Sequence, residues 1–186
     1  HDIPEKLYRY WKTRYSLFSL YDSGVALNEE QWFSVTPEAV AVSVAEYLYE
    51  CQPDAQVIVD GFCGAGGNSI QFARLFPRVI SIEIDPVTMA CAKQNARVYG
   101  VEDKIEFILG DVFEVLKSLI KQDIKVDIIY ASPPWGGPSY LNQSVFDLSQ
   151  MVPYDLQHIY SQFSCISKNI CLFLPKSSDL QQIADL

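Results

Sequence analysis

The stretch that decides the fold is VIVDGFCGAGGNS (57–69), a short apolar run that ends in an acid and a turn with four glycines. Glycine lets the backbone turn tightly and approach a ligand closely, and a helix starting after the turn adds a positive dipole end. This arrangement is typical of a strand–turn–helix unit that binds a small ligand. Such turns also occur without a ligand, so this stretch alone does not establish a binding site, and the rest of the sequence has to be considered.

Four more apolar runs follow, and patterns with helical spacing separate them. The runs are almost continuously apolar, as expected for parallel strands that are buried on both faces. Strands are predicted at 57–60, 79–84, 105–109, 126–131 and 169–174, with helices near 69–76, 87–99, 112–121 and 154–166. Asp85 and Pro86 supply an N-cap and a first-turn proline, and Gly100 a C-terminal stop, for the helix at 87–99. The alternation predicts an α/β protein with a doubly wound, mostly parallel sheet, which binds ligands at the carboxyl ends of its strands.

The N-terminal part has a helical pattern of its own. Apolar residues recur with helical spacing through 5–20, and 33–50 reads as a loop leading into a helix with Thr36 as N-cap and Pro37 in the first turn. We therefore predict a helical extension (1–50) that packs like a lid on a core formed by 51–186.

Composition narrows the class of protein. With 186 residues, 49% hydrophobic, the chain can bury a core as one domain, and no run is long enough for a membrane helix. The first residue is His1, which suggests an excised domain. The net charge is −9, but residues 1–20 carry four basic and two acidic side chains, leaving −11 for the remainder. Because affinity for a phosphate backbone comes from Lys and Arg, any nucleic-acid contact should be small and near the N-terminus.

Cysteine and histidine limit the chemistry further. The five cysteines include no CxxC pair, which favours a reducing intracellular location over a disulfide scaffold or zinc ribbon. Only two histidines are present, so a multi-His metal site is disfavoured and His158 is a weak candidate for a Ser-His-Asp triad. We expect no metal.

Three acids follow three successive predicted strands: Asp60, Glu83 and Asp111. They could bind a metal, a nucleoside or nothing. Glu83 lies 23 residues after Asp60, close to the offset of about 20 residues for a ribose-binding carboxylate. Ser69 stands where a dinucleotide motif has its third glycine, so a cofactor without pyrophosphate, such as S-adenosylmethionine, suits the turn better than NAD.

The fourth strand leads into SPPWGG (132–137). Two prolines remove two N–H donors and leave carbonyl acceptors, Ser132 adds a hydroxyl, and Trp135 a flat ring. Acceptors that hold the hydrogens of an exocyclic amine, with a ring stacked on the base, would orient the nitrogen lone pair toward a methyl donor. The alternative is a rigid proline turn with a buried tryptophan.

These motifs together resemble a known family. DGFCGAGGN, IEIDP and SPPWGGP are similar to class I (Rossmann-like) S-adenosylmethionine-dependent methyltransferases that act on exocyclic nitrogens. With YWKTRYSLFS, EQWFSVTPE, NARVYG and the late FLP, essentially the whole chain resembles the trimethylguanosine synthases, the cap hypermethylases. The resemblance implies transfer of two methyl groups to N2 of the 7-methylguanosine cap of small nuclear and nucleolar RNAs. It also implies a nuclear location, of the nucleolar or Cajal-body type, with a cytoplasmic one left open.

The resemblance also assigns site residues. Those implied to hold the cofactor are Phe18, Thr36, Asp60, Gly64, Gly66, Glu83 and Asp111. Those implied at the reacting amine are Ser132, the Pro133 carbonyl and Trp135, which would stack on the methylated guanine. Those implied to meet the rest of the cap are Arg9, Ser34, Asn95, Tyr140 and Lys176.

The chain departs from the family pattern in two places. Ala26 and Asn28 stand where relatives often have a lysine and an acid. The resemblance also implies two further strands after residue 186, so we expect the sheet of residues 1–186 to be without its antiparallel edge pair. The sequence leaves two other functions open. One is a methyltransferase that acts on an internal RNA or DNA base or on a protein amide. The other is a non-catalytic module that binds the cap or the cofactor. An NAD-dependent dehydrogenase is disfavoured by Ser69 and SPPW.

Overall fold

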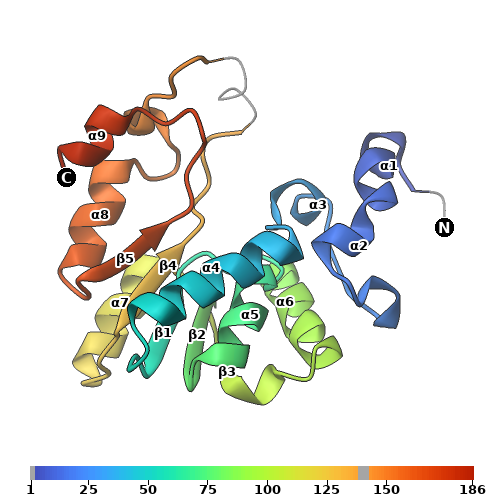
Figure 1. Ribbon diagram of the computed structural model, residues 1–186, viewed down its shortest axis with the longest axis horizontal. Coiled ribbons are helices and arrows are strands. Elements are labelled where there is room, and N and C mark those ends of the chain that lie inside the picture. Colours follow the sequence, from blue (N-terminus) through green and yellow to red (C-terminus); the bar gives the residue numbers. More distant parts are fainter. Residues whose placement is uncertain (1–2, 138–142) are drawn as a thin grey trace.

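A five-stranded sheet forms the centre of the computed structural model, which describes residues 3–137 and 143–186 (Figure 1). Its strand order is β3-β2-β1-β4-β5, and every neighbouring pair is parallel. The strands are β1 (Val57–Asp60), β2 (Arg78–Glu83), β3 (Ile105–Leu109), β4 (Ile128–Ala131) and β5 (Asn169–Leu172). The order reverses between β1 and β4, where doubly wound sheets bind their ligands. The predicted fold class is therefore confirmed.

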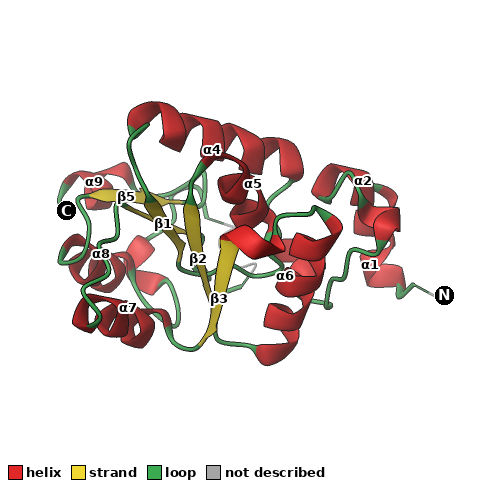
Figure 2. Ribbon diagram, turned by 90° about the horizontal axis from the view of Figure 1, so that it is seen from below, coloured by secondary structure: helices red, strands yellow, loops and turns green. Residues whose placement is uncertain are grey.

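Helices cover both faces of the sheet. Figure 2 shows α4 and α5 above the strands and α7 and α8 below them. These helices and their neighbours are α4 (Glu38–Cys51), α5 (Gly67–Leu75), α6 (Pro86–Val98), α7 (Val112–Lys121), α8 (Leu156–Ser164) and α9 (Leu180–Ala184). None of the helices in the described ranges is long and apolar enough to cross a membrane.

Strand side chains alternate between two buried clusters. Ile58 and Tyr130 face the α5 side, where Phe72 packs edge-on against Tyr130 with ring centroids 5.1 Å apart. Val59 and Ile129 face the other side, in a cluster that includes Leu116 of α7. Because both faces are covered, the strands had to be apolar throughout, which is why they could be recognised.

The N-terminal pattern forms two helices instead of one. They are α1 (Glu5–Lys12) and α2 (Arg14–Leu17), followed by α3 (Gln31–Ser34). The interruption falls at Thr13, whose hydroxyl donates to the Tyr10 carbonyl at 3.1 Å, the kind of local side-chain bond that competes with a helix. Leu7 and Phe18 are buried, whereas Tyr15 is 47% exposed. Figures 1 and 2 place α1 and α2 on the opposite side of the molecule from α8 and α9.

The sequence predicted the capping residues of two helices, of which one prediction is confirmed and one is wrong. At α6, the Asp85 side chain accepts from the Thr88 amide at 2.6 Å, Pro86 is the first helical residue, and Gly100 follows with φ +67°, as expected. At α4 the prediction was wrong by one residue. The helix begins at Glu38 with Pro37 in the N-cap position, and Thr36 forms no cap.

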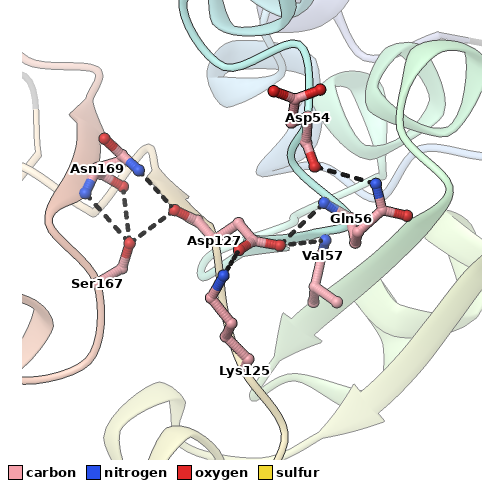
Figure 3. Close-up of polar contacts among 7 residues, drawn as sticks. All are labelled: Asp54, Gln56, Val57, Lys125, Asp127, Ser167 and Asn169. Carbon is pink, nitrogen blue, oxygen red and sulfur yellow. Dashed lines mark hydrogen bonds and ion pairs between the residues drawn. The ribbon is translucent and has the colours of Figure 1, made fainter.

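Several predicted strand ends were also wrong, and one of them lies next to Asp127. The predicted strand 126–131 begins only at Ile128, and the carboxylate of Asp127, directly before it, accepts from the Gln56 and Val57 amides at 2.9 and 3.0 Å. Its carbonyl accepts from Ser167 Oγ at 2.8 Å and Asn169 Nδ2 at 3.0 Å (Figure 3). This one residue therefore joins the amino ends of β1, β4 and β5. Strand β5 likewise ends at Leu172, two residues before the predicted end.

Candidate functional site

The glycine-rich turn joins β1 to α5 at the carboxyl edge of the sheet. Gly64 and Gly66 have φ values of +54° and +85°, in the left-handed region that favours glycine. A methyl group at Gly64 would also come within 2.7 Å of the side-chain oxygen of Gln31. The backbone here is therefore both left-handed and closely approached, and the first turn of α5 points its free amides at the same edge.

Glu83 ends β2 beside this turn. One carboxylate oxygen, Oε2, accepts from the Gly64 amide at 3.0 Å, and Oε1 accepts from the Ile84 and Asp85 amides at 2.9 and 3.0 Å. The carboxylate is thus fixed by backbone donors while its side chain stays partly exposed. A fixed, accessible acceptor at this place suits the hydroxyl groups of a ribose.

Asp60 ends β1 and is buried. Its Oδ2 accepts from Ser69 Oγ at 2.6 Å, and Ser69 in turn accepts from Ser81 Oγ at 2.7 Å. Its Oδ1 has no hydrogen-bond partner among the described residues. Burial raises the pKa of Asp60 to about 7. The hydrogen bond from Ser69 lowers this pKa, and the negative charge of Glu83 raises it.

Two more buried polar atoms near Asp60 lack partners in the described part of the chain: Asn68 Oδ1 and the Tyr130 hydroxyl. Thr36 Oγ1 accepts from Asn68 Nδ2 at 3.0 Å. Burial raises the pKa of the Tyr130 phenol well above its usual range. Buried polar groups are rarely left unsatisfied. An unpaired carboxylate oxygen, together with a fixed acid on the next strand and a glycine turn, fits the ammonium and ribose of S-adenosylmethionine.

The N-terminal extension closes over the turn. Gln31 Oε1 accepts from the Ala65 amide at 2.9 Å, and a methyl group at Gly67 would touch Val35, the Thr36 carbonyl and the Phe18 ring. The structure therefore places both Phe18 and Thr36 against the first turn of α5. Gln31 was not predicted as a site residue, since a lone glutamine in a helical segment carries no sequence signal.

Asn95, predicted to lie near the cap, bonds to two backbone segments in the structure. It is fully buried, its Nδ2 donates to the Ala26 and Ala65 carbonyls at 2.9 Å each, and its Oδ1 accepts from the Ala26 amide at 2.7 Å. All of its polar atoms are used to join the N-terminal segment to the glycine turn. In the structure Asn95 connects these two segments, and its predicted place near the cap stays a prediction.

Asp111 follows β3 and caps α7. Its Oδ1 accepts from the Phe113 and Glu114 amides at 3.0 and 3.2 Å, and its Oδ2 accepts from the Tyr154 hydroxyl at 2.7 Å. Burial alone would raise the pKa of Asp111, but these hydrogen bonds outweigh it and the pKa is lowered. Gly110 donates its amide to the Glu83 carbonyl at 2.9 Å, so Asp111 and Glu83 stand side by side at the strand ends.

The SPPW segment leaves β4 at the same edge. Ser132 is partly buried, Pro133 is buried and Trp135 is partly buried. The Trp135 indole Nε1 donates to the Phe173 carbonyl at 3.2 Å, and the two rings lie 20° from parallel with centroids 6.2 Å apart. Phe173 follows β5, so this contact fixes the tryptophan against the next strand along the sheet. Trp135 is thus neither a fully exposed ring nor a core residue.

The other predicted cap residues that the structure describes lie on different elements. Arg9 on α1 and Lys176 after β5 are exposed, and no contact in the described ranges joins them. Ser34 is exposed at the end of α3, where its Oγ donates to the Glu30 carbonyl at 3.0 Å. Tyr140 lies outside the described residues. Within the described ranges, no group of three or more His, Cys, Asp or Glu is placed to hold a metal ion.

Comparison with known proteins agrees with this geometry. The chain is 42% identical over 184 residues to the trimethylguanosine synthase of Schizosaccharomyces pombe, covering 98% of this chain and 76% of that protein. It is 41% identical over 181 residues to the trimethylguanosine synthase of Saccharomyces cerevisiae, covering 96% of this chain but 58% of that protein. Among solved structures, an S-adenosylmethionine-dependent methyltransferase from Agrobacterium tumefaciens has the same fold, with a TM-score of 0.59 at 18% identity over 80% of this chain and 49% of that one.

A family model described as RNA cap guanine-N2 methyltransferase matches residues 55–186, the part that contains the glycine turn, the three strand-end acids and SPPW. This match covers well over half of the chain, and the identity to the relative from S. pombe extends it through the N-terminal helices. The chain therefore belongs to the RNA cap guanine-N2 methyltransferase family, whose methyl donor is S-adenosylmethionine.

Proposed function

We propose that this chain transfers methyl groups, one at a time, to N2 of the 7-methylguanosine cap of small nuclear and nucleolar RNAs, giving 2,2,7-trimethylguanosine. The observation that carries the proposal is the match to the cap guanine-N2 family over 55–186, in a chain whose described site has acceptors for the donor on two adjacent strands. The names of both yeast relatives support the same substrate.

Three acids have separate tasks in the proposed complex. Asp60, with its unpaired Oδ1, receives the ammonium group of the methionine part. Glu83, held by backbone amides, receives the ribose hydroxyls, and Asp111 lies beside the adenine. When bound, S-adenosylmethionine supplies an electrophilic methyl group on a sulfonium sulfur.

The substrate amine needs orientation, because its lone pair is delocalised into the guanine ring. In the proposal, Ser132 and the Pro133 carbonyl accept the two N2 hydrogens, so that the lone pair points away from them and toward the donor. A carboxylate would bind the same edge of guanine but would occupy the amine tightly. Trp135 stacks on the base, and the positive charge of 7-methylguanine adds a cation–π contribution that plain guanine lacks.

The negative charge of the chain fits a substrate that is bound through its cap. Residues 21–186 have a net charge of −11, which disfavours long contacts with an RNA backbone. Arg9 and Lys176 are the exposed cations that we assign to the cap phosphates. A nuclear location is part of the proposal, and fluorescence microscopy of the tagged protein tests it.

The decisive experiment incubates a 7-methylguanosine cap analogue, without RNA, with the protein and S-adenosylmethionine, and analyses the products by mass spectrometry. We expect products with one and then two added methyl groups, and much less product from the analogue without the N7 methyl. Methylation of an internal base in RNA but not of the free cap would favour a different exocyclic-amine methyltransferase. Binding of both ligands without any product would favour a non-catalytic binding module.

A further inference from the structure

A tyrosine two residues before α8 donates a hydrogen bond to one oxygen of the Asp111 carboxylate. Tyr154 donates its hydroxyl to Asp111 Oδ2 at 2.7 Å, while Oδ1 already accepts two backbone amides. Each carboxylate oxygen has two lone pairs. Oδ1 is therefore fully used, and Oδ2 keeps one free acceptor position whose direction is set by the tyrosine.

The Tyr154 ring is itself held in place by aromatic neighbours. It packs edge-on against Phe113 with centroids 4.7 Å apart and stacks on His158 at 5.4 Å and 16°. Phe113 also packs edge-on against His158 at 4.9 Å. Since Phe113 belongs to α7 and His158 to α8, this cluster fixes the two helix starts together, and with them the position of the hydroxyl.

Asp111 lies where a nucleoside bound at Glu83 would extend. Glu83 pairs in register with Leu109, two residues before Asp111, and the Gly110 amide donates to the Glu83 carbonyl. Ile84, directly after Glu83, is 68% exposed and offers an apolar surface at the same edge. A base carried by a ribose at Glu83 therefore meets an apolar side chain and one carboxylate with one acceptor position left.

We propose that Tyr154 is a positioning residue that aims the remaining acceptor position of Asp111 at the 6-amino group of the cofactor's adenine. It thereby helps to select a 6-aminopurine over a 6-oxopurine. An amine donates a hydrogen to this position, whereas a carbonyl oxygen would face a carboxylate and repel it. The inference rests on the proposed function, because that function places the adenosine at Glu83 and Asp111.

The test compares two ligands that differ at this atom, S-adenosylhomocysteine and S-inosylhomocysteine, by calorimetry. The wild type should prefer the adenine ligand. Tyr154→Phe keeps the ring and its packing but removes the hydroxyl, and should lower the ratio of the two affinities by about 3- to 10-fold. Asp111→Asn is the second variant and should lower the same ratio at least as much, because an amide can present its N–H to the purine.

Tyr160→Phe is the matched control. Tyr160 lies on the next turns of α8, and its hydroxyl makes no hydrogen bond with the described residues, so its removal should leave both affinities unchanged. Equal loss of both ligands in Tyr154→Phe would show a purely structural role and overturn the inference. An unchanged ratio would overturn it as well. If the wild type itself bound neither ligand, the proposed function would fail, and the wild-type titration alone distinguishes that outcome.

Discussion

Substituting Asp60 by asparagine should remove a pH dependence of stability that the wild type carries in its ligand-free state. Burial raises the pKa of Asp60 in the folded protein to about 7, against 3.8 for an ordinary aspartate. A carboxyl group with a raised folded-state pKa keeps its proton in the native state at pH values where the unfolded chain has lost it. Stability therefore falls as the pH rises from about 4 to 7, with a slope of about 1.4 kcal/mol per pH unit at most.

Integrated between pH 5 and pH 8, the shift corresponds to a loss of about 2–3 kcal/mol in the free energy of unfolding. The assay is urea unfolding followed by tryptophan fluorescence, for wild type and Asp60→Asn at several pH values. The difference between the two proteins isolates Asp60 from other titrating groups, and it should shift in favour of the variant as the pH rises. Asparagine can still accept the Ser69 hydroxyl through its side-chain carbonyl.

Asp85→Asn is the control for this experiment. The pKa of Asp85 is lowered by hydrogen bonds from Thr88, so its contribution is already complete above pH 4 and is lost only at lower pH. Its difference curve should be flat between pH 5 and pH 8. A flat curve for Asp60→Asn would refute the reasoning, because it would mean that the buried carboxylate has found a partner for Oδ1. Saturating S-adenosylhomocysteine should flatten the wild-type curve, since its ammonium compensates the charge of Asp60.

Three further outcomes are expected. Glu83→Ala should weaken S-adenosylhomocysteine binding by about 1–3 kcal/mol in calorimetry, because the ribose hydroxyls lose their acceptor, and an unchanged affinity would remove Glu83 from the site. Trp135→Ala should lower affinity for a 7-methylguanosine cap analogue at least ~10-fold by loss of stacking on a cationic base, with Trp135→Phe intermediate. Normal cap binding by the folded Trp135→Ala variant would place the stacking elsewhere. Charge reversal at Arg9 or Lys176 should raise KM for a cap triphosphate far more than for the nucleoside, whereas equal effects on both would mark them as ordinary surface residues.

The sheet could be predicted because its strands are buried on both faces. Ile58, Val59, Ile80, Ile128 and Ile129 are all fully buried, so no polar alternation interrupts the apolar runs that mark the strands. The acids at the strand ends could be predicted from the same apolar runs, because an acidic residue directly after such a run is easily recognised. These signals are local in the sequence.

What the sequence could not predict depends on contacts between distant segments. The strand predicted from residue 126 begins only at Ile128, after Asp127, whose carboxylate accepts from two amides about 70 positions away, and Thr36 accepts from Asn68 instead of capping α4. Asn95 joins two segments, although its place in a helix suggests nothing of the kind. A side chain that bonds across the fold leaves no periodic signal, so its partner appears only in three dimensions.

Because of Asp127, the strands are joined at one edge of the sheet while the candidate site lies at the other. It sets the register of β1, β4 and β5 from their amino ends with bonds to backbone and side chains, far from the glycine turn, the acids and SPPW at the opposite edge. Loops at the carboxyl edge can therefore lengthen, shorten or change their chemistry during evolution while the strands stay aligned. The chemistry at the carboxyl edge of this chain can therefore change without a change in its core.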